Sequence, residues 1–167
     1  MGYQEHKEKA PQSVSCAVLT ISDTRTEQDD DSGKIIRQKL SQGGHRVIFY
    51  AIVKNEAESI KKKINELLNQ EEVQVIITSG GTGVSHRDVT VDAVSSIIGK
   101  RLDGFGELFR FLTYQEIGTA SVMTRAIAGV AAGKVILCFP GSPAAAELAM
   151  DKIILPEIGH MVREATR

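Results

Sequence analysis

The chain has few cysteines and no excess of charge of either sign, and each shortage excludes a class of protein. Its two cysteines, Cys16 and Cys138, both lie inside apolar runs, so a disulfide framework is excluded and a reduced, cytoplasmic compartment is expected. We expect both thiols to behave as buried small hydrophobic groups. Lysine and arginine number 20 and aspartate and glutamate 21, which gives a formal net charge of -1. This balance argues against a basic nucleic-acid-binding module.

Long apolar runs and metal-ligand spacings are also missing. No apolar run approaches the roughly 18 residues that a membrane span needs, so we expect no membrane segment. The four histidines share no zinc-ligand spacing, and no zinc site is predicted. The N-terminal stretch lacks the apolar core of a secretory signal, and residues 1–13 are expected to form a disordered tail. No interior linker stands out, so residues 14–167 are expected to form one domain.

Four short runs rich in β-branched residues stand out in the remaining sequence. They are nearly continuous rather than alternating, as are strands that are buried on both faces of a parallel sheet. Periodicity alone cannot separate them from buried helix, but their lengths favour strands. The predicted strands cover residues 16–21, 47–53, 73–77 and 135–139.

Amphipathic segments lie between and after these runs. Apolar residues repeat at helical spacing around residues 35–40, 60–68, 94–98, 105–115 and 146–154. Ser32 is the predicted N-cap of the first helix and Gly43-Gly44 its end, and Thr90 could cap the third helix. The alternation predicts an α/β fold with a mostly parallel sheet and helices on both faces. Residues 122–130 are expected to form a strand that turns at residues 131–133 into the last strand, as an antiparallel hairpin at the sheet edge.

A glycine-rich turn follows the third predicted strand. Residues 78–83 have the sequence TSGGTG, and consecutive N–H groups in such a turn can bind an anion. Arg87 offers donors for phosphate or carboxylate, and Asp88 offers oxygen ligands suited to Mg²⁺. The turn lacks the Gly-Lys-Ser/Thr ending of a P-loop and the G-x-G-x-x-G spacing of a dinucleotide fold. The residues alone therefore leave two interpretations, a site for a phosphorylated ligand with a metal and a tight turn without a chemical role.

Two further loops follow strands at the same edge of the predicted sheet, where ligands bind in open α/β folds. Residues 140–143 form the rigid sequence Pro-Gly-Ser-Pro, in which Ser142 is interpreted as the N-cap of the next helix because no base stands near it. Asp23 follows the first strand. The acidic run that comes after it, including Asp29 and Asp30, is interpreted as loop charge rather than as metal ligands.

Taken together, these motifs resemble the MoaB/MogA family of molybdenum cofactor biosynthesis proteins, and the overall pattern is closer to the MoaB branch. The stretch TSGGTGVSHRDVT is similar to the most distinctive signature of that family, and FPGSPAAAELAMDKIILPEIGH is similar to its C-terminal signature. VLTISDTRT with DDDSG fits the start of the family pattern, and GFGELFRFLTYQEIGTASVMTRAIAG fits the segment between the signatures. The match extends over residues 15–160, nearly the whole expected domain.

The resemblance implies a three-layer α/β/α domain that assembles as trimers, or as hexamers built from them. It implies binding of molybdopterin, a dithiolene pterin phosphate, and in active members Mg²⁺-dependent transfer of AMP from ATP to molybdopterin. By position in the motifs, Asp88 would hold Mg²⁺ and phosphate. The matching ligand-binding positions are Ser79, Gly80, Gly81, Thr82, Gly83, Asp23, Glu107, Arg110, Pro140, Gly141, Ser142 and Pro143. Glu107 and Arg110 stand three apart on a predicted helix and could equally pair with each other.

One departure from the family pattern bears on activity. After the second strand, active members carry a Pro-Asp pair whose aspartate is a second catalytic carboxylate, and this chain has Lys54-Asn55 followed by Glu56. An amide carries no negative charge to hold a metal, whereas Glu56 could supply one from the next position. Two interpretations follow. One is a molybdopterin adenylyltransferase that uses Asp88, Asn55 and Glu56, and the other is a non-catalytic molybdopterin-binding or scaffold protein of the same fold.

Overall fold

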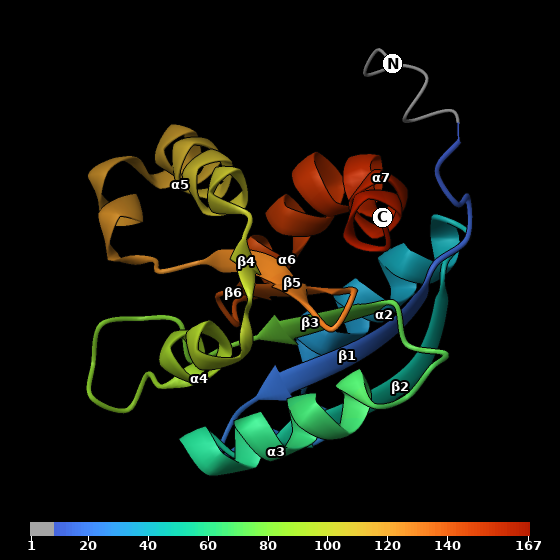
Figure 1. Ribbon diagram of the computed structural model, residues 1–167. Helices are drawn as coiled ribbons and strands as arrows, with labels where there is room; N and C mark the ends of the chain where they lie inside the picture. Colours follow the sequence, from blue (N-terminus) through green and yellow to red (C-terminus); the bar gives the residue numbers. More distant parts are fainter. Residues whose placement is uncertain (1–8) are drawn as a thin grey trace.

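The computed structural model describes residues 9–167, which form a sheet covered by helices on both faces (Figure 1). The strands are β1 (Ser15–Ile21), β2 (Arg46–Val53), β3 (Val75–Ser79), β4 (Lys100–Arg101), β5 (Ile127–Ala131) and β6 (Lys134–Phe139). The helices are α2 (Asp31–Gln42), α3 (Ala57–Leu68), α4 (Thr90–Ile97), α5 (Asp103–Ile117), α6 (Pro143–Ala149) and α7 (Leu155–Ala165), with a 3-10 turn η1 (Gly118–Met123) and a π turn η2 (Met150–Ile154). The three-layer α/β fold is thereby confirmed. No helix within residues 9–167 is long and apolar enough to span a membrane.

The sheet has six strands in the order β2-β1-β3-β6-β5-β4. The first four strands in this order are parallel to one another, whereas β5 runs antiparallel to both β6 and β4. The carboxyl ends of β2, β1, β3 and β6 therefore meet at one edge of the sheet. The loops that follow these strands carry most of the residues predicted to bind a ligand.

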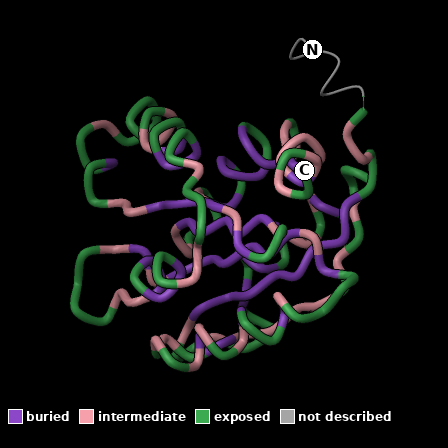
Figure 2. The backbone as a smooth tube through the Cα atoms, in the orientation of Figure 1, coloured by how far each residue is buried: buried purple, intermediate pink, exposed green. Residues whose placement is uncertain are grey.

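Alternate residues of each central strand enter two separate cores. Val18, Ile77 and Leu137 face α2, α5, α6 and α7, while Leu19 and Ile136 face α3 and α4. Figure 2 shows the buried strands running between the two layers of partly exposed helices. Burial on both faces explains why these strands appear in the sequence as continuous apolar runs.

The structure corrects the predicted strands in three places. The hairpin of β5 and β6 is confirmed and turns at Ala132-Gly133, but the strand predicted from residue 122 is wrong over its first part, because η1 occupies residues 118–123. The third strand begins at Val75, two residues later than predicted, and continues to Ser79. The short strand β4 was not predicted. It consists of Lys100-Arg101, which pair with Gly129 and Val130 at the sheet edge.

The helix ends agree with the sequence in two places and differ in two. The end of α2 at Gly43 is confirmed, and so is Ser142 as the N-cap of α6, because its Oγ accepts the backbone N–H three residues later. The N-cap of α2 is Asp30 rather than Ser32, since Asp30 lies one position before the helix and its carboxylate accepts the N–H three residues later. Thr90 caps nothing. It is the first residue of α4, and its Oγ1 has no hydrogen-bond partner among residues 9–167.

At the C-terminal end of the chain, α6, η2 and α7 follow one another without a break in the helical backbone. Of the predicted N-terminal tail, residues 1–8 lie outside the described part, and Ala10 and Pro11 lie against Gly159 of α7. The prediction for the cysteines is confirmed: both are free and buried, and burial raises the pKa of Cys16 and of Cys138 to about 12.

Candidate functional site

The glycine-rich loop after β3 and the Pro-Gly-Ser-Pro loop after β6 lie directly against each other. The Gly80 amide donates to the Phe139 carbonyl at 3.0 Å, and the Ser79 hydroxyl contacts the Pro140 carbonyl at 3.4 Å. A Cβ on Gly141 would lie only 3.1 Å from the Cα of Gly80. The structure therefore brings the predicted residues 79–83 and 140–143 together at one place on the sheet edge.

The glycine loop adopts a backbone that only glycine tolerates well. Gly80 has φ +111° and Gly81 has φ +66°, and a Cβ on Gly80 would lie 2.4 Å from the Ile21 carbonyl oxygen. Within residues 9–167, no acceptor receives the amides of Gly81, Thr82 or Gly83. Successive unbonded amides in such a turn form a concave cluster of donors, which is suited to an anion.

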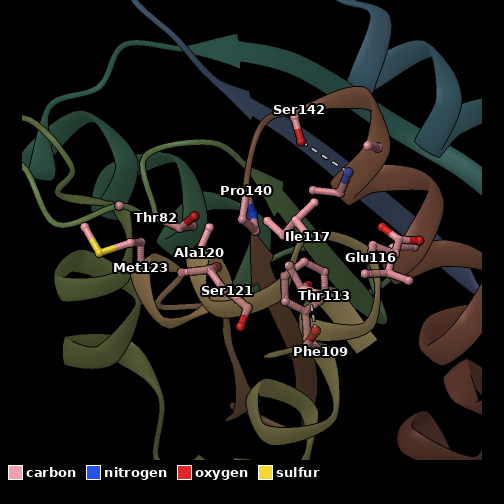
Figure 3. A pocket seen from close by; sticks show the side chains of 15 residues that line it. Thr82, Phe109, Thr113, Glu116, Ile117, Ala120, Ser121, Met123, Pro140 and Ser142 are labelled. Carbon is pink, nitrogen blue, oxygen red and sulfur yellow. Dashed lines mark hydrogen bonds between the residues drawn. The ribbon is translucent and has the colours of Figure 1, made fainter. Parts of the chain in front are cut away.

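A cavity of about 330 Å³ opens on one side of this loop (Figure 3). Its walls come from the glycine loop, the loop after β6, one face of α5, the turn η1 and the start of α6. The lining is mainly apolar, with a few polar groups; it comprises Thr82, Gly83, Phe109, Thr113, Glu116, Ile117, Ala120, Ser121, Met123, Thr124, Pro140, Ser142, Ala144, Ala145 and Leu148. An apolar cavity with few polar groups is typical of a small-molecule site. The contribution of α5 to this cavity was not predicted, although residues 109, 113, 116 and 117 have the spacing of one helix face.

A second, more open hollow of about 430 Å³ lies beside the segment that follows this loop. It is lined by Asp23, Lys54, Asn55, Glu56, His86, Arg87 and Val89. Residues 82 and 83 of the glycine loop line the first cavity, and residues 86, 87 and 89, in the segment that follows the loop, line this hollow. The site can thus receive ligand groups from two sides.

Hydrogen bonds in the second hollow tie together the loops after β1, β2 and β3. Asp23 accepts the backbone amide of Asn55 at 2.9 Å and lies 3.5 Å from the guanidinium of Arg87. The predicted substitute carboxylate, Glu56, is exposed, and its Oε2 accepts the hydroxyl of Ser59 at 3.0 Å in the first turn of α3. Asp23, Asn55, Glu56 and Arg87 are therefore neighbours.

Asp88 is the carboxylate that lies against the glycine loop. Its Oδ2 accepts the Ser85 amide at 3.0 Å, and a Cβ on Gly83 would lie 2.7 Å from the same oxygen. Within residues 9–167, no three histidine, cysteine or acidic side chains gather as a metal cluster, and the Oδ1 of Asn55 is buried. Mg²⁺ in proteins is often held by one or two carboxylates together with substrate phosphates. Asp88 therefore fits a Mg²⁺ site that substrate phosphates complete. It does not fit a site in which protein side chains supply all of the ligands.

Arg125, which follows η1, links this wall of the cavity to the glycine loop and to α4. The Arg125 amide donates to the Thr82 carbonyl at 3.1 Å, and its guanidinium makes two bonds to Asp92 of α4, at 2.8 and 3.1 Å. Hydrogen bonding within this pair lowers the pKa of Asp92 and raises that of Arg125. A two-pronged arginine–carboxylate pair fixes geometry as well as charge.

Asp30 organises the loop after β1, and its interpretation as loop charge is wrong. Its side chain is fully buried, and its carboxylate accepts bonds from the Thr20 hydroxyl at 2.6 Å, the Tyr50 hydroxyl at 2.6 Å and the Gly33 amide at 3.0 Å. Burial alone would raise the pKa of Asp30, but hydrogen bonds from these groups and from Ser32 outweigh it and hold the pKa below its usual range. An aspartate immediately before Asp-Ser-Gly at a helix start was the available signal.

Two predicted ligand positions lie away from the glycine loop. Glu107 and Arg110 line a separate hollow of about 140 Å³, on a different face of α5 from Phe109 and Thr113. Arg110 donates to the Ala126 carbonyl at 3.1 Å instead of pairing with Glu107. Any role that these two residues have in ligand binding is therefore not a direct contact within the two hollows described above.

The fold and the loops at its edge define a small-molecule-binding α/β domain, and comparison with known proteins specifies the class. A family model described as "Probable molybdopterin binding domain" matches residues 17–160. The chain is 46% identical to molybdenum cofactor biosynthesis protein B of Bacillus cereus, over all of this chain and 99% of that protein. It is 44% identical to the protein of the same name from Bacillus subtilis, over 98% and 97% of the two chains.

Solved structures agree with the sequence comparisons. A crystal structure of a molybdenum cofactor biosynthesis protein B superposes with a TM-score of 0.91 at 47% identity, covering 94% of this chain and 98% of the other. The tungsten cofactor synthesizing protein MoaB from Pyrococcus furiosus superposes with a TM-score of 0.82 at 33% identity, covering 95% and 100%. The chain belongs to the MoaB/MogA family of molybdenum cofactor biosynthesis proteins, and its residues 17–160 match the molybdopterin-binding domain of that family.

Proposed function

We propose that this protein binds molybdopterin at the glycine loop and, with Mg²⁺, transfers AMP from ATP to it. The observation that carries the proposal is that the glycine loop lines one cavity while the segment that directly follows it lines a second hollow. Three amides of the loop have no acceptor among the described residues and are available to an anion, and Asp88 lies against the same loop. Two ligands entering from the two sides would meet where these donors lie. Both ligands carry phosphate, so donors and a cation are the groups such a site requires.

In the proposed reaction, an oxygen of the pterin phosphate forms a bond to the α-phosphorus of ATP. The bond from that phosphorus to the oxygen bridging it to the β-phosphorus breaks, and its electron pair leaves with pyrophosphate. The glycine-loop amides would bind phosphate oxygens and fix their direction, and Arg87 would offset negative charge. Asp88 would hold Mg²⁺, which, when bound, neutralises charge that builds up on the phosphates. No covalent intermediate with the protein is needed.

A second candidate function is binding of molybdopterin without catalysis. The observation in its favour is Asn55, which stands where active members are expected to carry aspartate, while Glu56 is exposed and bonded to Ser59. A chain with one carboxylate beside the phosphates would hold the cation less firmly than one with two. The two functions differ only in turnover, since both require the glycine loop and the adjoining cavity.

Assembly into a homo-oligomer, a trimer or a hexamer, is a further part of the proposal. The exposed large hydrophobic residues gather mostly on α5 and η1: Leu108, Phe111, Tyr114, Ile117, Val122 and Met123. Exposed apolar groups gathered in this way are typical of protein–protein contacts. Light scattering after size-exclusion chromatography should give a mass of at least three chains, and Phe111→Glu should reduce it. A monomeric unmodified chain at micromolar concentration would contradict this part of the proposal.

The decisive experiment mixes the purified protein with molybdopterin, ATP and Mg²⁺ and measures adenylylated molybdopterin and pyrophosphate. Asp88→Asn should lower turnover by at least about a hundredfold, as removal of a transition-state charge partner commonly does. Asp31→Asn, at an exposed carboxylate on α2, is the matched control and should leave turnover unchanged. Binding of molybdopterin without product would select the non-catalytic function, and absence of binding would exclude both.

A further inference from the structure

Asn55 joins three loops through two hydrogen bonds. Its backbone amide donates to Asp23 at 2.9 Å, and its side-chain Nδ2 donates to the carbonyl oxygen of Arg87 at 2.6 Å. The first bond connects the loops after β1 and β2, and the second connects the loop after β2 to the segment that follows the glycine loop. The second bond is the shorter, and it holds the residue immediately before Asp88.

The other side-chain atom of Asn55 does not face the ligand hollows. Its Oδ1 is buried, has no hydrogen-bond partner among the described residues, and points at the backbone of Gly81, where an added Cβ would lie 2.8 Å away. The oxygen that would correspond to a metal-binding carboxylate oxygen is therefore packed against protein. What Asn55 contributes to the site is its N–H donor.

An aspartate at this position could not make the same contact. An ionised carboxylate has acceptors only, so one of its oxygens would face the Arg87 carbonyl oxygen, and two acceptors at that distance repel. Its other oxygen would be a buried charge against Gly81, at a place where the Asn55 oxygen makes no hydrogen bond with the described residues. Substitution by aspartate would therefore do more than restore a possible metal ligand. It would also remove the hydrogen bond to the Arg87 carbonyl and add a buried negative charge.

We propose that Asn55 is a latch, a positioning residue whose side-chain amide holds the Arg87–Asp88 segment in place over the second hollow, and that aspartate breaks this latch in this chain. The latch goes beyond the proposed function and does not depend on it. Only its effect on Asp88 as a cation ligand rests on the proposed adenylyl transfer. Where active family members are expected to carry a charged aspartate, this chain has a neutral side chain. In exchange, that side chain donates a hydrogen bond that holds the loop.

Limited digestion with trypsin tests the latch directly. Trypsin cleaves after arginine, and to do so it must draw the Arg87 carbonyl into its own active site, which requires that the bond from Asn55 be broken. Arg87 is otherwise accessible, with 73% of its side chain exposed. The rate of appearance of fragments 1–87 and 88–167, followed by mass spectrometry, therefore reports whether the carbonyl is held.

Asn55→Ser and Asn55→Asp should each speed this cleavage by about tenfold, the factor that corresponds to one lost hydrogen bond. Asn55→Gln keeps an amide donor on a longer side chain and should restore part of the protection. Asn65→Asp, on the exposed surface of α3, is the control for the added charge and should leave the rate unchanged. Thermal unfolding of each variant separates loosening of the loop from general loss of structure.

The proposal is overturned if the Asn55 variants are cleaved after Arg87 no faster than the unmodified chain. It is also overturned if millimolar Mg²⁺ makes the cleavage of Asn55→Asp slower than that of the unmodified chain, because the aspartate would then have formed a cation site. If Asn55→Asp unfolds, Asn55→Ser alone decides, since it removes the donor without adding a charge. No pterin or nucleotide is present in this assay, so a failed adenylyl transfer assay would leave its result intact.

Discussion

The loops after β1 and β3 end side by side at the same edge of the sheet, yet they satisfy their buried polar groups very differently. In the first loop, the fully buried Asp30 accepts several hydrogen bonds, two of them 2.6 Å long. Against the second loop lie two buried oxygens, Asn55 Oδ1 from the loop after β2 and Thr90 Oγ1 from the start of α4, which have no partner among the described residues. Both oxygens crowd Gly81, whose φ is +66°.

This difference indicates that the loop after β1 supports the structure, whereas the glycine loop serves the candidate site. A buried carboxylate with all of its bonds made specifies one loop conformation. Buried oxygens left unpartnered, beside a backbone that only glycine adopts easily, are features found at binding sites. The β1 loop is thus the fixed side of the site, and the glycine loop is the side at which polar groups are left unpartnered.

The largest expected effect is on the fixed side, in Asp30→Ala. This change leaves the buried donors of Thr20, Tyr50 and Gly33 without their acceptor, so we expect the free energy of unfolding to fall by about 3–5 kcal/mol. Asp31→Ala, at the neighbouring exposed carboxylate, should cost less than about 1 kcal/mol. Urea unfolding of both variants checks the comparison, and equal losses would show that Asp30 has no special role.

Gly80→Ala should show how tightly the glycine loop is fitted. Its Cβ would lie 2.4 Å from a backbone oxygen of Ile21, which cannot move as a side chain can, so we expect a cost of about 2–3 kcal/mol. Gly44 also has a positive φ, +81°, but a Cβ there meets nothing within 4 Å. Gly44→Ala should therefore cost only about 1 kcal/mol, the backbone strain alone. A similar melting temperature for the two variants would contradict the close approach.

Acid should weaken the β1 loop through Asp30. Its folded pKa lies below the unfolded value of about 3.9, so the native state binds fewer protons than the unfolded state in this range. The resulting stability is fully present above the unfolded pKa and is lost as pH falls through the folded one. Urea unfolding from about pH 5 downward should show a steep loss, with a shallower slope in Asp30→Asn. Parallel slopes would assign the acid sensitivity to other carboxylates.

The smallest effect is expected beside the glycine loop, in Thr90→Val. The Thr90 hydroxyl is buried and unpartnered, so replacing it with a methyl group of similar size should leave stability unchanged or raise it by up to about 1 kcal/mol. Thr20→Val is the matched change in the β1 loop, where the hydroxyl donates to Asp30, and should cost about 1–3 kcal/mol. If both changes cost the same, the Thr90 hydroxyl has a partner after all.

The sequence predicted best the elements whose structure follows from the pattern of their own residues. The parallel strands β1, β3 and β6 lie close to the predicted ranges because residues buried on both faces need an apolar side chain at nearly every position. The edge strand β2 is only partly buried, and its apolar run alone made it predictable. The strand β4 could not be predicted, because Lys100-Arg101 have no apolar pattern and are a strand only through pairing with β5. The turn η1 was mistaken for strand since Val122 and its neighbours resemble a strand by composition, although Val122 is 76% exposed.

The candidate site was predicted in part for the same reason. The glycine and Pro-Gly-Ser-Pro loops follow predicted strands, so parallel topology brings them together. The positions of Glu107 and Arg110 depend on which face α5 turns toward the sheet, and spacing along the helix does not determine that. Asp30 was misjudged because a charged residue in a loop is usually solvated, and its burial arises from Thr20 and Tyr50 on two strands.

The π turn η2 makes the length of the last helical segment matter as much as its composition. Five buried residues recur at every fourth position across α6, η2 and α7: Ala146, Met150, Ile154, Ile158 and Val162. An α-helix repeats every 3.6 residues, so such a stripe would drift by about 40° at each step if the helix were regular. The wider turn at Met150–Ile154 takes up part of that drift. Relatives that lose a single residue there would have to find a new packing face for α7, whereas substitutions within the stripe could be absorbed one at a time.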